Sequence, residues 1–423
     1  MFIYILQLPL RAKDNNKLNL SYFISKKLAS GQKEGFSSTI HTIAIISIAI
    51  GLAASIVAFL IMKGFQETVK NKIYGFSGHL VITKFTMSNS QEEQPMNYQI
   101  DLYKNQVQYP FIDHIQEYAH KTGLIKTEND VVGVVIKGVG KSFDYNAFKE
   151  NMVEGEFITF PDSGYASQVV LSRTIADKCE VKVGDNILIH FFQNPPRFRK
   201  LKVVGVYETN LSEYYDSKVI LADLRMLQRL NDWSDSLAGG LEVFVKDPEK
   251  VDDAGVAIGE MMDFDLNIER VSDRYLQVFE WLHLLSRQVN ILLGIILTVV
   301  CVNMISIILI LVMERTQMIG LLKALGARDR FIRSVFVYNG INLVIKGLLL
   351  GNAIGLGLCF LQYQFKIFKL NPKDYYMSFV PISWHWEIVL LLNVLMLLIV
   401  SLVLLLPTMV ISRINPIKAI RFD

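Results

Sequence analysis

Four long apolar stretches constrain this 423-residue chain more than any other feature of its sequence. They are His41–Met62, Val289–Met313, Ser334–Phe365 and Ile388–Ser412. A helix needs about 20 residues to cross the hydrocarbon core of a bilayer, and each stretch reaches that length. Lys346 is the only Lys, Arg, Asp or Glu inside them. Buried helices of a soluble protein do not need this length, so the sequence predicts a membrane protein with four transmembrane α-helices.

The charged residues predict how these spans are oriented. The formal net charge is only +3, but the charges are unevenly distributed along the chain. Residues 1–40 contain six Lys or Arg and two Asp or Glu, and residues 63–286 contain 24 Lys or Arg and 33 Asp or Glu. Residues 287–423 contain 13 Lys or Arg and 5 Asp or Glu. Because Lys and Arg gather on the cytoplasmic side of membrane spans, both termini are predicted to be cytoplasmic. The same segregation argues against a cytosolic enzyme and against a nucleic-acid-binding protein.

The spans divide the chain into nine segments. The N-terminal segment 1–40 is expected to be cytoplasmic and to form an interfacial amphipathic helix. The spans themselves are expected at 41–62, 288–313, 334–365 and 388–412. The remaining segments are a periplasmic domain at 63–287, a cytoplasmic loop at 314–333, a short periplasmic loop at 366–387 and a cytoplasmic tail at 413–423. This layout is that of a multi-pass protein of the bacterial inner membrane.

The segment 63–287 is long enough to bury a core of its own, and its pattern is mixed. Strand-like runs are found at His79–Lys84, Val131–Lys137, Val169–Leu171, Asn186–Phe192, Leu201–Tyr207 and Leu241–Lys246. Helix-like runs are found at Phe111–Lys121, Leu221–Asn231 and Pro248–Met262. The predicted fold class is therefore a membrane protein of four transmembrane α-helices, with a large mixed α/β periplasmic domain between the first and the second.

No motif in the chain predicts catalysis or metal binding. Gly140-Lys141-Ser142 matches the end of a phosphate-binding P-loop, but that motif requires a glycine where the chain has Val135. A strand followed by a turn is the better interpretation. The seven histidines are scattered and form no HExxH pattern. We therefore expect no catalytic residue, no metal ligand and no cofactor in this chain.

A pair of prolines interrupts two strand-like runs in the segment His190–Lys200. Pro195 and Pro196 cannot donate backbone hydrogen bonds, so they predict a stiff loop that projects from the strands. One interpretation is a hairpin tip that merely turns the chain, and composition alone favours it because prolines are common there. The other is a preorganised docking site for a second protein, formed by Asn194, Pro195, Pro196 and Arg197.

A short amphipathic helix is predicted directly after the second span. Its apolar residues Met318, Ile319, Leu322 and Leu325 recur with helical spacing, and Gly326 can end the helix. Such a helix can lie in the membrane interface, or it can insert into a groove on a cytoplasmic partner.

This helix and the order of the spans resemble those of the FtsX/MacB-type permeases, and within them the LolC/LolE group of lipoprotein-releasing ABC transporters. The resemblance extends over essentially the whole chain. The motifs that carry it are Tyr22–Leu28, Met62–Glu67, Gly78–Ile82, Leu171–Ser172, Val183–Asp185, Val203–Tyr207, Tyr214–Asp216 and Pro416–Arg421. The chain departs from the family at Met318, where many relatives have an acidic residue, and at Lys63, where asparagine is common.

The resemblance implies a permease subunit that extracts lipoproteins from the inner membrane and passes them to a periplasmic carrier of the LolA type. ATP and Mg²⁺ would be bound by a separate dimer of cytoplasmic ABC ATPase subunits, which would contact the helix after the second span. The residues implied in that contact are Arg315, Met318, Ile319, Leu322, Lys323, Leu325 and Gly326. The carrier would dock on the loop Asn194–Arg197, and a second permease chain, the same or related, would complete the transporter.

Two sets of residues in the spans are expected to pack against helices or lipid. Gly347, Gly351 and Gly355 form a stripe of small residues that lets two helices approach closely. Apolar faces of the first and second spans would surround the acyl chains of a lipoprotein between two permease chains. The residues expected to line that acyl site are Ile48, Leu52, Ile56, Ile295, Val299 and Val302.

Two other functions fit the same layout. A mechanotransmitter of the MacB or FtsX kind would drive efflux or activate hydrolases and would not need the proline loop. A membrane-anchored receptor or scaffold would have no ATPase and would not need the helix after the second span.

Overall fold

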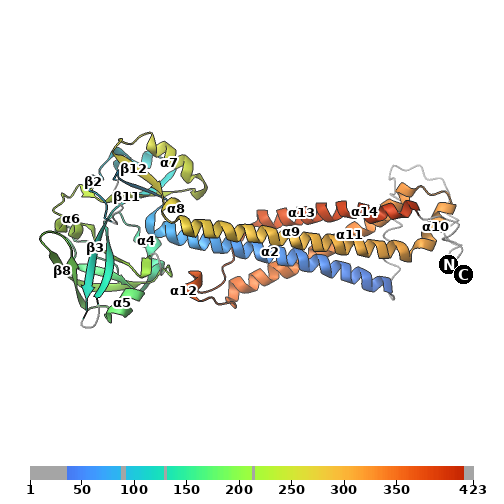
Figure 1. Cartoon of the computed structure of the whole chain (residues 1–423), viewed down its shortest axis with the longest axis horizontal. Helices are drawn as coiled ribbons and strands as arrows, with labels where there is room; N and C mark the ends of the chain where they lie inside the picture. The colour runs from blue at the N-terminus through green and yellow to red at the C-terminus, as the bar shows by residue number, and fades with distance from the viewer. Residues whose placement is uncertain (1–35, 87–91, 128–130, 212–214, 414–423) are drawn as a thin grey trace. The chain divides into compact units, whose positions relative to one another are not determined.

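The computed structural model describes residues 36–86, 92–127, 131–211 and 215–413 of the chain (Figure 1). The predicted interfacial helix within 1–40 and most of the predicted tail lie outside the described residues. The chain divides into two compact units. Of the described residues, 36–64, 285–365 and 382–413 belong to the helical unit, and those within Phe65–Leu284 and Lys366–Pro381 belong to the α/β unit.

Among the residues that the structure describes, four helices are long and apolar enough to cross a membrane. They are α2 (Phe36–Ser77), α9 (Leu276–Glu314), α11 (Asp329–Phe365) and α13 (Trp386–Val403), the last followed by α14 (Leu405–Thr408) and the 3₁₀ turn Met409–Arg413. Two helices extend beyond the predicted spans: α2 continues to Ser77, and α9 already begins at Leu276. Apolar composition locates the membrane segment, whereas the flanking Lys, Gln and Glu residues are good helix formers and continue the helix.

The long helices of the helical unit share one apolar core. Buried side chains come from all four, among them Leu52 of α2, Met304 of α9, Leu343 of α11 and Met396 of α13. A polar pair also joins two of the helices. The side-chain amides of Asn352 on α11 and Asn393 on α13 donate to each other's oxygens at 2.7 and 3.0 Å. The short helix α10 (Thr316–Ala324) lies between α9 and α11 in the sequence.

The α/β unit is built on a mixed ten-stranded sheet in which neighbours follow the order β12-β1-β11-β3-β4-β9-β6-β8-β5, with β7 paired to β3 and β8. Its strands are β1 (Leu80–Lys84), β3 (Ile112–Lys126), β4 (Val131–Val139), β5 (Met152–Gly155), β6 (Gln168–Ser172), β7 (Asn186–Phe191), β8 (Arg197–Tyr207), β9 (Val219–Asp223), β11 (Gly240–Val245) and β12 (Leu266–Arg270). Two short strands, β2 (Met96–Asn97) and β10 (Leu237–Ala238), pair separately.

The α/β unit also contains short helices. They are α3 (Asp101–Lys104), α4 (Tyr145–Phe148), α5 (Arg173–Cys179), α6 (Leu224–Leu230), α7 (Val251–Gly259), α8 (Val271–Arg274) and α12 (Pro372–Tyr375). Of these, α8 leads from β12 into α9, and α12 lies between α11 and α13 in the sequence. Apolar residues of α5 and α6 pack with the central strands in one core, and those of α7 pack with β1, β11 and β12 in another. In the described part of the α/β unit, the helices therefore pack on at least two separate apolar cores.

The prediction of a helix at Phe111–Lys121 is wrong, because this segment belongs to the 15-residue strand β3. Ile115, Tyr118 and Ala119 are buried at a spacing that imitates a helix. The intervening Gln116 and Glu117 are buried as well, so the polar and apolar alternation of a strand is hidden.

The run Leu221–Asn231 begins as β9 and becomes α6 only at Leu224. The predicted strands overlap β1, β4, β6, β7, β8 and β11.

Candidate functional site

The proline loop, residues 192–196, connects β7 to β8. The two strands pair antiparallel up to Phe191 and Arg197, so they form a hairpin. The side chains of Asn194, Pro195 and Pro196 at its tip are exposed. Two aromatic side chains flank the tip, Phe192 with 72% and Phe198 with 63% of its surface exposed. The hairpin therefore presents a rigid turn with exposed aromatic area, which suits a protein contact.

Arg197 fixes the base of this loop instead of pointing outward. Its guanidinium donates to both carboxylate oxygens of Asp232, at 3.2 and 2.6 Å, and to the carbonyl of Leu230 at 2.5 Å. Gln193 donates to the same carbonyl at 3.1 Å. The hydrogen bond from Arg197 lowers the pKa of Asp232. Asp232 was not predicted as part of the site, because no sequence motif links it to a residue 35 positions away.

The helix α10 buries one face against the helical unit and exposes the other. Ile319 is fully buried, and Met318 and Leu322 pack on the same core. On the opposite face, Leu321 and Leu325 are 45% and 76% exposed. The helix ends in a Schellman motif, since the amides of Ala327 and Gly326 donate to the carbonyls of Leu322 and Lys323, and Gly326 has φ +85°.

The residues predicted to couple to an ATPase thus divide between two faces. Lys323 bonds within the chain, with its ammonium 3.1 Å from the Asp329 carboxylate and 2.8 Å from the carbonyl of Ile411. Arg315 lies 3.9 Å from Glu314. Of the predicted set, Leu325 and Gly326 are exposed. Leu321, which was not predicted, lies on the exposed face and could have been found by asking which apolar residues lie opposite Ile319.

The glycine stripe of α11 lies against α2. A methyl group placed on Gly347 would lie 2.7 Å from the Ile48 side chain, and one on Gly351 would lie 2.9 Å from the carbonyl of Ala49. A methyl group on Gly355 would lie 3.0 Å from the backbone of Ala53. The absence of side chains at these positions is therefore what allows the two helices to approach this closely.

The same packing corrects part of the predicted acyl site. Ile48, Leu52 and Ile56 are fully buried, because they face the glycine stripe, and they cannot line a surface shared with a second chain. Ile295, Val299 and Val302 of α9 are 56%, 53% and 57% exposed. The exposed apolar face of α2 comprises Ile43, Ile46 and Ile50. Sequence alone could not distinguish the faces of α2, since its apolar residues surround the helix.

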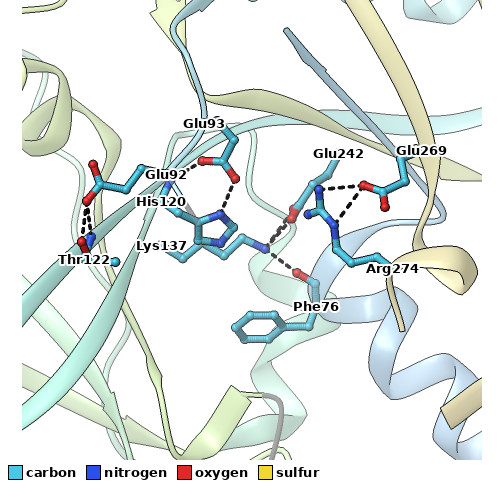
Figure 2. A network of polar contacts seen from close by, with 9 residues as sticks. All are labelled: Phe76, Glu92, Glu93, His120, Thr122, Lys137, Glu242, Glu269 and Arg274. Carbon is cyan, nitrogen blue, oxygen red and sulfur yellow. Dashed lines mark hydrogen bonds and ion pairs between the residues drawn. The ribbon is translucent and has the colours of Figure 1, made fainter. Parts of the chain in front are cut away.

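A buried charge lies at the centre of the α/β unit (Figure 2). Lys137 of β4 is 1% exposed, and its ammonium lies 2.7 Å from the carboxylate of Glu242 on β11, which is 3% exposed. The Lys137 ammonium also donates to the carbonyl of Phe76 in the last turn of α2. Gln116 of β3 donates to Glu242 at 2.7 Å. Side chains from three strands thus converge on the end of one helix.

A second polar cluster, the glutamate strap formed by Glu92 and Glu93, covers part of the edge of β3 (Figure 2). Along this edge β11 pairs up to Tyr118 and β7 pairs from Leu124. In the gap, the backbone amide of His120 donates to Glu93 and that of Thr122 donates to Glu92, both at 3.0 Å. The carboxylates therefore replace a missing strand as hydrogen-bond acceptors.

The glutamate strap should lose its contribution to stability in acid. Burial raises the pKa of both carboxyls, but bonds from Lys121 and Thr122 to Glu92, and from His120 to Glu93, outweigh it and hold each pKa below the ordinary 4.5. A lowered folded-state pKa gives stability that is complete above 4.5 and falls as the pH passes through the folded value. Melting temperatures measured between neutral and acidic pH should fall less steeply for Glu93→Gln than for the wild type. Equal pH slopes would contradict this role.

The turn at Gly140-Lys141-Ser142 does not form a phosphate cradle. Ser142 donates to the carboxylate of Glu117, and a methyl group on Gly140 would collide with that carboxylate. Lys141 pairs with Asp162 at 3.1 Å. A carboxylate at this position repels a phosphate, in agreement with the prediction of a simple turn. Within the described part of the chain, no group of three or more His, Cys, Asp or Glu side chains is placed to hold a metal ion.

Two family models match the chain. The model of the MacB-like periplasmic core domain matches residues 42–260, and the model of the FtsX-like permease C-terminal matches residues 290–416. The first match begins in α2 and includes most of the α/β unit. The second includes α10, α11 and α13.

Full-length relatives are similar along nearly the entire chain. The lipoprotein-releasing system transmembrane protein LolE of Haemophilus influenzae is 25% identical over 405 residues, which cover 92% of this chain and 94% of that protein. The transmembrane protein LolC of the same system in Neisseria meningitidis serogroup B is 21% identical over 426 residues, which cover 96% of this chain and 98% of that protein. Among solved structures, the periplasmic region of MacB from Actinobacillus actinomycetemcomitans aligns with a TM-score of 0.33 and 14% identity, over 48% of this chain and 92% of that one.

Proposed function

Because this chain belongs to the permease family that combines a MacB-like periplasmic core domain with an FtsX-like C-terminal region, we propose that it releases lipoproteins from the bacterial inner membrane as a subunit of an ABC transporter. The observation that carries the proposal is the similarity to lipoprotein-releasing permeases over more than nine tenths of both chains. The excess of Lys and Arg in residues 1–40 and 287–423 supports cytoplasmic termini and a periplasmic α/β unit.

A partner ATPase dimer would supply the energy, with ATP and Mg²⁺ bound there and not in this chain. The exposed face of α10, with Leu321 and Leu325, is the surface that we assign to this contact. Exposed leucines beside a membrane are suited to a groove on a cytoplasmic partner. The buried Ile319 and the partly buried Lys323 would instead hold α10 in position on the helical unit.

Replacing Leu325 with aspartate should remove the ATPase from the purified complex. Placing a carboxylate in an apolar contact leaves a desolvated charge, which costs about 2 kcal/mol or more, so at least tenfold less ATPase should co-purify. Leu325→Met, which keeps the apolar surface, is the matched control. A Lys323 variant is unsuitable because it would also break bonds within the chain.

Co-purification of the wild-type chain from its native membrane, with crosslinking and identification of the attached proteins, tests the whole proposal. Recovery of an ATPase together with a lipoprotein is expected. An ATPase without any lipoprotein would favour a mechanotransmitter, and recovery of neither would favour a receptor or scaffold.

The lipoprotein acyl chains would lie against the exposed faces of α2 and α9, between this chain and a second permease chain. Ile43, Ile46 and Ile50 of α2 provide one apolar face, and exposed residues of α9 such as Val299 provide the other. The Ser47 hydroxyl accepts a hydrogen bond from Asn303 at 2.9 Å, which joins the two helices between these faces. The remaining apolar surface would contact membrane lipids.

The proline loop would receive the periplasmic carrier. Replacing Pro195 and Pro196 together with glycine should weaken carrier binding about tenfold, because each change adds 0.4–1 kcal/mol of conformational freedom that binding must remove. Calorimetric titration with the organism's lipoprotein carrier measures the effect. Phe85→Ser, at an aromatic residue that is 58% exposed elsewhere on the α/β unit, is the control. An unchanged affinity of the diglycine variant would refute the docking role.

A further inference from the structure

The corner between α7 and β12, which we call the α7–β12 corner, contains an open cleft of about 500 Å³ whose lining is mainly apolar but includes Asp252, Asp263 and Arg270. Leu80, Leu266 and Ile268 contribute its apolar wall. Phe264 at the rim is fully exposed, and Val256 on α7 is 66% exposed. Exposed apolar side chains beside a cleft make this corner a candidate contact surface.

Two glycines on α7 keep this cleft open. Gly255 and Gly259 are four residues apart and therefore share a helix face, which is directed at the cleft. A methyl group on either one would make only an ordinary contact, 3.5 Å from Leu80 or 3.8 Å from Ile268. Packing therefore does not require glycine at these positions, although Gly255 in the helix interior weakens α7 by about 1 kcal/mol relative to alanine. What a larger side chain would remove is the space in the cleft.

The outer edge of β12 offers backbone hydrogen bonds next to the cleft. Strand β12 is the last strand in the sheet order, and within the described residues only β1 pairs with it. The backbone amide of Phe85 donates to the carbonyl of Asp265, and that of Val271 donates to the carbonyl of His79. These two hydrogen bonds determine which residues of β12 direct their backbone groups toward β1. By the alternation of an antiparallel pair, the N–H and C=O groups of Ile268 face outward. This edge can therefore accept an additional strand.

The charge around the cleft selects what can bind there. Residues 251–266 include five Asp or Glu and no Lys or Arg. Arg270 pairs with Asp252 at 2.6 Å, whereas none of the salt bridges among the described residues involves Asp253, Glu260, Asp263 or Asp265. Two copies of this surface would repel each other, so charge disfavours self-pairing and favours a basic partner.

We propose that the α7–β12 corner binds an extended, basic segment of a partner protein, which adds as a strand to β12 and inserts an apolar side chain into the cleft. The outward amide and carbonyl of Ile268 would bond its backbone. The cleft between Gly259 and Ile268 would hold its apolar side chain. The carboxylates of Glu260 and Asp263 would attract its flanking Lys or Arg residues. This inference is independent of the proposed transport function.

The test measures binding of a fluorescein-labelled peptide, Lys-Val-Lys-Leu-Lys-Val-Lys, to the full-length chain in nonionic detergent by fluorescence anisotropy. The peptide Glu-Val-Glu-Leu-Glu-Val-Glu is the charge control. Saturable binding of the basic peptide that weakens as salt is added is expected, without binding of the acidic peptide. Neither ATP, an ATPase nor a lipoprotein is needed, so the result does not depend on the function proposed above.

Three variants separate the three features of the corner. Gly259→Leu fills the cleft, Ile268→Pro removes the outward donor without touching the bonds to β1, and Glu260→Gln with Asp263→Asn removes two charges. Each should weaken binding about tenfold or more, as the loss of one anchoring interaction predicts. Gly259→Ala and Ile268→Val, which keep the cleft and the donor, should bind as the wild type does.

Several results would overturn the proposal. These are the absence of saturable binding, equal binding of the acidic peptide, or wild-type binding by either Gly259→Leu or Ile268→Pro. Loss of binding in the charge variant alone would show a non-specific ionic contact and would also overturn it. Sedimentation that reveals a dimer abolished by Ile268→Pro would assign the corner to a second copy of the chain instead.

Discussion

Replacing Lys137 with methionine should destabilise the centre of the α/β unit by about 3–5 kcal/mol. The substitution leaves the carboxylate of Glu242, which is 3% exposed, without its cation in a site that water does not reach. It also removes the donor to the carbonyl of Phe76, one of the last carbonyls of α2, which has no partner within the helix. Hydrogen exchange in β4 and β11 of the full-length chain measures the effect, and exchange should accelerate more than a hundredfold.

The double substitution Lys137→Met with Glu242→Leu is the decisive control. Replacing both members of a buried ion pair with apolar residues of similar volume is often neutral or even stabilising, so exchange should return close to the wild-type rate. If the double variant were as unstable as the single one, the packing volume of the lysine and not its charge would be responsible. Wild-type exchange in the single variant would contradict the burial of the pair.

The membrane helices could be predicted from the sequence because one physical requirement determines them. A span must remain apolar for about 20 residues, and this requirement does not depend on where other parts of the chain lie. The spacing of Gly347, Gly351 and Gly355 likewise predicts a close helix contact without naming the partner helix. The hairpin around Pro195 could be predicted because consecutive prolines end a strand wherever they occur.

Features that depend on distant residues could not be predicted. Lys137 and Glu242 are 105 positions apart, and each by itself looks like an ordinary surface charge in a strand. Asp232 anchors Arg197 only because the end of α6 lies beside the hairpin. The helix predicted in place of β3 fails for a related reason, since its buried Gln116 is satisfied by Glu242 from another strand. Such pairings are set by tertiary structure, which a local pattern does not report.

The faces of a membrane helix are hidden in the sequence for a different reason. In a soluble protein the polar face of a helix marks the solvent side, but a span is apolar all round because lipid and protein core accept the same residues. Ile48, on the buried face of α2, and Ile50, which is 60% exposed, are therefore equivalent as sequence. The glycine stripe on the neighbouring helix was the one signal that could have identified Ile48 as a packing residue.

Replacing Gly351 with valine should force α2 and α11 apart. A methyl group at this position would lie 2.9 Å from the carbonyl oxygen of Ala49 and 3.1 Å from its Cα, and these are backbone atoms that cannot turn aside. Relieving this clash requires one whole helix to move, and that movement also separates the residues that surround Leu52. Overpacking of this kind typically costs 1–3 kcal/mol, and a rigid backbone neighbour places this site at the upper end.

Gly357 provides a matched control on the same helix, because a methyl group there would have no atom within 4 Å. Gly357→Val makes the same chemical change with the same effect on helix propensity, and it should alter stability by no more than about 0.5 kcal/mol. The comparison is made by adding sodium dodecyl sulfate to the protein in mixed micelles and following loss of helix by circular dichroism. Equal losses of stability in the Gly351→Val and Gly357→Val variants would mean that helix propensity, and not packing against α2, is responsible. A loss confined to Gly351 would show that α11 holds the Ile48 face of α2, so that only the opposite face, with Ile43, Ile46 and Ile50, remains available to cargo or lipid.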